Sequence, residues 1–154
     1  MIQKLTITKP DDWHIHLRQD KELLTTVAHA ASQFNRVVAM PNTIPPIKNI
    51  ADGLNYKQAI IENTPAAFKH SFNPLIALYL TDHTQAETIK SASSDPNFIG
   101  AKFYPKGATT NSQNGVTDIS KIYNILAIME ECSFPLLVHG EVNDESVDEI
   151  GRAS

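Results

Sequence analysis

The chain has 154 residues, of which 42% are hydrophobic and 19% charged, and its formal net charge is −4. This balance is typical of a globular protein, and the length predicts a single domain over residues 1–154 with a sizeable core. The acidic balance argues against a nucleic-acid partner, and the single Cys132 excludes an internal disulfide. The apolar runs are too short to span a bilayer and no apolar leader is present, so we expect a cytoplasmic protein without a membrane partner.

Short apolar segments alternate with helical patterns along the chain. We expect strands at residues 13–16, 36–40, 74–80, 98–104 and 135–139. Four of these segments are apolar over most of their length, which is typical of strands that are buried on both faces of a parallel sheet.

The segments between the strands have a helical period. We expect helices at residues 21–34, 50–63, 84–93 and 117–132, the last with Thr117 or Asp118 as its N-cap. The positions predicted to face the core are Leu23, Leu24, Val27 and Ala31 in the first helix, Ile50, Leu54 and Ile61 in the second, and Ile119, Ile122, Tyr123, Leu126 and Met129 in the last.

The alternating order of strands and helices indicates a parallel α/β architecture. No G-x-G-x-x-G turn follows the first strand, so nothing favours an open dinucleotide-binding sheet. Polar residues gather instead at the carboxyl ends of several strands, where a (β/α)8 barrel builds its active site. A barrel needs eight strands, so we expect about five strands of one. The polar segment 106–116 is long for a connection of this kind, which suggests a functional loop.

Two histidines stand two residues apart in the first strand. Side chains at positions i and i+2 of a strand share a face, so His14 and His16 can offer two neutral nitrogens to one divalent metal ion. An H-x-H pair of this kind is more often a pair of ordinary surface histidines, and only its polar surroundings favour ligation.

Lys102 and His139 each end a later apolar strand. A lysine at a strand end usually reaches water, and a histidine there is usually a buried residue with satisfied hydrogen bonds. Burial near other cations lowers the pKa of a lysine, and the neutral amine can take up CO2 to give a carbamate that bridges metal ions. Three such strand ends in one barrel favour a metal site.

Arg18 and Asn42 are candidate substrate anchors. Arg18 lies two residues beyond the histidine pair and offers a planar fork for a carboxylate, and Asn42 follows the second strand. Either residue can equally be a plain surface side chain.

Taken together, these segments resemble the single-function bacterial dihydroorotases of the amidohydrolase superfamily. The resemblance covers residues 5–148 and rests on segments 10–18, 40–42, 79–82, 101–105, 108–112, 115–117 and 135–141, which occur in the family's order.

The resemblance implies a (β/α)8 barrel in which two zinc ions are bridged by a hydroxide and by a carboxylated lysine, N6-carboxylysine. His14 and His16 would bind one metal, His139 the other and modified Lys102 both. Arg18 and Asn42 would bind the substrate carboxylate, while a loop with Thr109 and Thr110 would close over the ligand. The implied reaction is the reversible cyclisation of N-carbamoyl-L-aspartate to L-dihydroorotate in pyrimidine synthesis, by an enzyme that is a homodimer when intact.

The family's next histidine ligand and its general acid/base aspartate have no counterpart in this sequence, and residues 149–154 leave the family pattern. We therefore expect residues 1–154 to be inactive by themselves. Two alternatives stay open: another cyclic-amide hydrolase, such as a hydantoinase, and a non-catalytic fragment that binds a partner.

Overall fold

The computed structural model describes residues 6–141 and contains five strands and four α-helices. The strands are β1 (Asp12–Ile15), β2 (Arg36–Ala39), β3 (Asn73–Tyr79), β4 (Phe98–Phe103) and β5 (Leu136–Val138). The helices are α1 (Asp20–Gln33), α2 (Ile50–Asn63), α3 (Ala86–Ser93) and α4 (Tyr123–Glu131), which a 3₁₀ turn at Ile119–Ile122 precedes.

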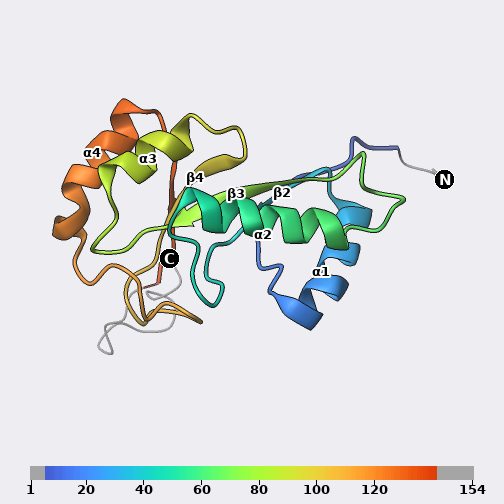
Figure 1. Ribbon diagram of the computed structural model, residues 1–154, viewed down its shortest axis with the longest axis horizontal. Coiled ribbons are helices and arrows are strands. Elements are labelled where there is room, and N and C mark those ends of the chain that lie inside the picture. Colours follow the sequence, from blue (N-terminus) through green and yellow to red (C-terminus); the bar gives the residue numbers. More distant parts are fainter. Residues whose placement is uncertain (1–5, 142–154) are drawn as a thin grey trace, which may run out of the picture.

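All the strand pairs are parallel, and the spatial order β1-β2-β3-β4-β5 follows the chain. A doubly wound sheet reverses its strand order at a switch point, whereas a barrel adds each strand beside the last. The helices follow the same order: α1 lies beside α2, and α3 packs against α4 at the other end of the sheet (Figure 1). The fold is therefore that of the first five β-strands of a (β/α)8 barrel, as the sequence predicts.

Side chains alternate between two faces of this sheet. The larger hydrophobic cluster joins strand residues such as Val37, Ile76 and Leu78 to the buried sides of the helices. A smaller cluster, with Val38 and Leu75, lies on the opposite face. That second face corresponds to the inside of a barrel, and the site residues stand at its carboxyl end.

Some positions predicted to face the core are exposed. Leu24 is 56% exposed, Ile119 45% and Tyr123 60%, and Leu54 and Ile61 are exposed to a smaller degree. Each barrel helix buries only a narrow stripe against the sheet, so the flanks of the predicted apolar face stay in water. The 3₁₀ turn has three residues per turn, which shifts Ile119 and Tyr123 off the stripe of α4. Asp118, one of the two predicted caps, caps the 3₁₀ turn and not α4, because its side chain accepts a hydrogen bond from the Ser120 amide.

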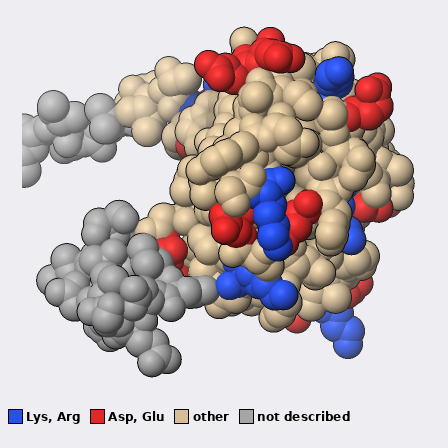
Figure 2. Space-filling model, turned by 90° about the vertical axis from the view of Figure 1, so that its left-hand side faces the viewer, with Lys and Arg blue, Asp and Glu red and all other residues tan. Residues whose placement is uncertain are grey.

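The surface carries both signs of charge. On the face in Figure 2, acidic and basic side chains are interspersed among uncharged residues and do not gather into a patch of one sign. Within residues 6–141, no helix has the length and apolar character needed to cross a bilayer.

Candidate functional site

The H-x-H pair lies at the carboxyl end of β1, and its two rings share one side of the strand. The ring centroids of His14 and His16 are 5.3 Å apart. Trp13, which directly precedes His14 in sequence, turns the other way, and its ring lies 5.2 Å from the guanidinium of Arg36. The strand alternation predicted from sequence is therefore present.

Both imidazoles are held toward the neutral form. Burial lowers the pKa of His14, and the positive charge of Lys102 lowers it further. Burial also lowers the pKa of His16, against the opposing effect of its hydrogen bond to Asn42. A neutral ring is the form that binds a metal ion.

Lys102 is buried near the end of β4, which lies between β3 and β5. Only 1% of the residue is exposed, although its side chain ends in an amine. Its Nζ donates a hydrogen bond to the Val138 carbonyl at 3.1 Å and lies 5.5 Å from the centre of the Tyr104 ring. Burial lowers the pKa of this lysine, and within residues 6–141 no acidic side chain pairs with it. The amine is thus shifted toward its neutral, nucleophilic form.

His139 follows β5 and faces the same side of the sheet. Its backbone amide donates to the Phe103 carbonyl at 3.0 Å, and its Nε2 lies 2.8 Å from a carboxylate oxygen of Glu141. Its ring centroid is 5.8 Å from that of Tyr104, whose buried hydroxyl has no hydrogen-bond partner. The Tyr104 ring therefore has Lys102 and His139 near it, and both of these residues lie close enough to His14 and His16 to lower the pKa of each, so the four predicted metal ligands lie at one end of the sheet.

The donor set fits part of a divalent metal site. It brings nitrogen donors to the carboxyl end of the sheet. There the buried Lys102 amine has no acidic partner among the described residues, and the Tyr104 hydroxyl has no hydrogen-bond partner. Within the described residues, however, no three His, Cys, Asp or Glu side chains come close enough to hold a metal ion. His139 is turned to Glu141, and Lys102 supplies an amine instead of an acid. A carbamate on Lys102 would provide the missing anionic ligand.

Arg18 borders a cavity of about 550 Å³ next to the histidine pair, together with His16, Asn42 and Asn111. The backbone of Arg18 is in the left-handed region, with φ of 62°, and its carbonyl accepts a hydrogen bond from the Tyr56 hydroxyl at 2.7 Å. This uncommon backbone conformation is held by the hydrogen bond from the buried Tyr56 side chain. The cavity thus has a cationic fork on one wall and amide groups on another.

Asn42 is buried, and its polar groups are already engaged. The side-chain oxygen lies 2.9 Å from His16 Nδ1, and the side-chain nitrogen donates to the Thr110 carbonyl at 2.9 Å. Its own backbone carbonyl accepts a hydrogen bond from the Asn111 side chain at 3.0 Å. Asn42 lies where a substrate anchor was predicted, and it also contacts a predicted metal ligand.

The loop with Thr109 and Thr110 lies over the second strand end. The Thr109 amide donates to the Ser112 hydroxyl at 2.9 Å, and the Tyr79 hydroxyl donates to the Asn111 carbonyl at 3.1 Å. Thr110 contributes its carbonyl to Asn42. Sequence reasoning did not single out Asn111 or Tyr79, although Asn111 directly follows the threonine pair.

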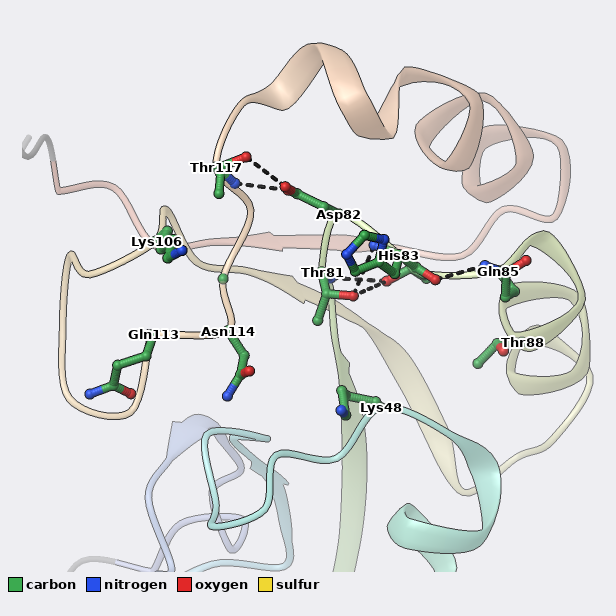
Figure 3. Close-up of a pocket in the computed structure, with 12 residues that line it drawn as sticks. Lys48, Thr81, Asp82, His83, Gln85, Thr88, Lys106, Gln113, Asn114 and Thr117 are labelled. Carbon is green, nitrogen blue, oxygen red and sulfur yellow. Dashed lines mark hydrogen bonds between the residues drawn. The ribbon is translucent and has the colours of Figure 1, made fainter.

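A second cavity, of about 410 Å³, lies on the other side of this loop, between the turn after β3 and residues 113–117. Asp82 accepts hydrogen bonds from the amide and hydroxyl of Thr117, as Figure 3 shows, and pairs with Lys121. These contacts hold the pKa of Asp82 well below its usual range. None of the predicted site residues lines this cavity, so its contacts anchor the loop from outside the site.

Comparison with known proteins gives a consistent result. No family model matches the chain. The chain is 48% identical over 152 residues to the dihydroorotase of Pseudomonas fluorescens and 46% identical over 151 residues to that of Acaryochloris marina. These matches cover 99% and 98% of this chain, but only 43% of each relative. The chain therefore spans less than half the length of these curated relatives.

Solved structures give the same answer. The dihydroorotase of Campylobacter jejuni matches with a TM-score of 0.79 and 37% identity, over 88% of this chain and 39% of that one. The Saccharomyces cerevisiae dihydroorotase in complex with 5-fluoroorotic acid matches with a TM-score of 0.77 and 28% identity, over 90% and 38%. An L-hydantoinase from Arthrobacter aurescens, at 17% identity and a TM-score of 0.61 over 86% and 29%, shares the fold. The resemblance to the N-terminal part of dihydroorotases is confirmed.

Proposed function

We propose that this chain, whose sequence and fold correspond to the N-terminal part of dihydroorotases, supplies the first half of a zinc-dependent dihydroorotase active site. The substrates would be N-carbamoyl-L-aspartate and L-dihydroorotate, interconverted in pyrimidine synthesis. The observation that carries the proposal is the cluster of His14, His16, Lys102 and His139, which three segments far apart in sequence bring to one end of the sheet.

In this proposal His14 and His16 would hold one zinc ion, His139 would hold the second, and carboxylated Lys102 would contribute a ligand to both. The metal ions, when bound, would polarise the amide carbonyl and supply hydroxide at neutral pH. Burial of Lys102 favours its neutral amine, which is the form that reacts with CO2. The Arg18 guanidinium would pair with the substrate carboxylate at the wall of the 550 Å³ cavity.

The loop would complete the site by covering the bound ligand. Thr109 and Thr110 stand at its tip, and the amide of Asn42 already bonds the Thr110 carbonyl. For Asn42 to bind the substrate carboxylate, its side-chain nitrogen must exchange that carbonyl for the ligand. Excluding water in this way strengthens each charged contact in the site.

The test is a chimaera in which this chain replaces the matching N-terminal 43% of the Pseudomonas fluorescens dihydroorotase. Purified with zinc, it is expected to interconvert carbamoyl aspartate and dihydroorotate, and to act far more slowly on hydantoin. Equal or greater activity on hydantoin would instead favour the hydantoinase alternative. A well-folded chimaera with neither activity would refute the proposal.

A further inference from the structure

Asn42 lies between a predicted metal ligand and the loop over the site, and it is buried. It is 6% exposed, and three hydrogen bonds join it to His16, Thr110 and Asn111. Two of these bonds go to the loop and one goes to the H-x-H pair. A single amide therefore contacts both parts of the site.

The loop determines how this amide is oriented. The Thr110 carbonyl can only accept a hydrogen bond, so the side-chain atom of Asn42 that faces it, at 2.9 Å, must be the NH2 group. The carbonyl oxygen of the same amide is then the atom that faces His16 Nδ1, at 2.9 Å. That oxygen can only accept, so His16 Nδ1 must carry a proton.

A neutral imidazole has one N–H group, so a proton on Nδ1 leaves the lone pair on Nε2. Nε2 is the atom farther from the backbone and so the one available to a metal ion at the mouth of the barrel. A histidine without such a partner distributes its proton between both nitrogens, and the form with the proton on Nε2 cannot bind a metal through that atom.

We infer that Asn42 is a positioning residue that couples the loop at residues 109–112 to the tautomer of His16. When the loop is docked, the Thr110 carbonyl fixes the Asn42 amide, and the amide fixes the proton of His16 on Nδ1. When the loop lifts, the amide loses the acceptor that oriented it, and the tautomer of His16 is no longer determined. The coupling itself follows from the hydrogen-bond geometry alone. Its role in metal binding rests on the proposed function.

The coupling is testable in the metal-free 154-residue chain labelled with ¹⁵N-histidine, at about pH 8, where a free imidazole is neutral. Long-range ¹H–¹⁵N spectra distinguish the tautomers. In the parent chain, His16 is expected to carry its proton on Nδ1. Asn42→Ala is expected to move most of the population to the form with the proton on Nε2. Asn42→Asp keeps an acceptor and is expected to retain the Nδ1 proton.

Two loop variants separate coupling from simple loss of a contact. Asn111→Ala removes a loop anchor but leaves the Asn42 side chain intact, and we expect faster amide exchange at residues 109–112 together with a partial shift of the His16 tautomer. Asn114→Ala, an exposed amide on the same loop, is the matched control and should change neither quantity. An Nε2 proton on His16 in the folded parent, or an unchanged tautomer in folded Asn42→Ala or Asn111→Ala, would overturn the inference.

Zinc affinity provides a second readout. Removing a partner that orients a metal-binding histidine typically costs about 10–100-fold in affinity, and we expect a loss in that range for Asn42→Ala. A zinc-free chimaera in which His16 keeps the Nδ1 proton would leave the coupling intact and count against the proposed function. The two ideas therefore fail in different experiments.

Discussion

At the scale of single residues, Lys102 is the least ordinary feature of the chain, because a long cationic side chain is 1% exposed with one hydrogen bond to a carbonyl. Burying an amine without an anion costs free energy. We predict that Lys102→Met stabilises the metal-free chain by about 1–3 kcal/mol in urea unfolding while lowering turnover of the zinc-loaded chimaera by about a hundredfold or more. Partial rescue of Lys102→Ala by a small carboxylic acid would support the carbamate, and full activity of either variant would exclude it.

The two histidines give stability a pH dependence. Their folded pKa values lie below the usual 6.5, mainly through burial, so the unfolded chain binds protons more readily. The contribution of the neutral rings is complete above pH 6.5 and is lost as the pH falls through the folded values. We predict that the parent loses more stability between about pH 8 and about pH 5 than His14→Asn/His16→Asn does. Parallel losses in urea unfolding would contradict the assignment.

Much of the site at this scale follows from sequence. Position at a strand end and i, i+2 spacing place His14, His16, Lys102 and His139 in one cluster before any coordinates are known. The partners of Asn42 do not follow, because they depend on where a loop almost 70 residues later comes to lie. The same applies to Tyr79, which the sequence predicts only as a strand residue. Its hydrogen bond to the Asn111 carbonyl depends on the position of the loop.

At the scale of elements, the loop over the site depends on how its two ends are joined. Lys106 and Val116 are paired through the backbone, and the Val116 amide donates to the Tyr104 carbonyl at 2.9 Å. A Cβ added to Gly115 would lie 2.4 Å from that carbonyl oxygen. We therefore predict that Gly115→Ala separates this pairing and destabilises the chain by about 1–3 kcal/mol, with faster amide exchange at residue 116. Asn114→Ala, the exposed neighbour, should stay within about 0.5 kcal/mol of the parent, and an equal effect would argue against the steric explanation.

The strands follow from sequence more closely than the last helix does. Apolar runs bounded by polar residues give four of the five strands to within a residue or two, because a strand inside a parallel sheet needs little more than continuous apolar character. The segment 117–132 was predicted as one helix, whereas the chain forms a 3₁₀ turn before α4. Hydrophobic periodicity cannot distinguish a 3₁₀ turn from an α-helix over four residues, since the number of residues per turn differs by less than one between them.

At the scale of the whole molecule, β5 pairs only with β4 among the described strands, and Leu136 and Val138 are 39% and 57% exposed. A parallel edge with apolar side chains invites association. We predict that residues 1–154 alone associate in sedimentation experiments, that Val138→Lys reduces this association, and that neither protein turns over dihydroorotate. Monomeric behaviour of the parent would contradict the first expectation. Turnover within about tenfold of an intact relative would contradict the last, by showing that this chain needs no further barrel strands.

The central claim is that this chain contributes working metal ligands to a dihydroorotase. The most direct measurement is the zinc content and turnover of the chimaera, compared with those of its His14→Ala/His16→Ala and His29→Ala variants. His29 is an exposed histidine on α1 and serves as the control. We expect two zinc ions per chain and turnover of dihydroorotate in the chimaera and in His29→Ala, and loss of zinc and of most activity in the double variant. Unchanged zinc content in the folded double variant would contradict the account.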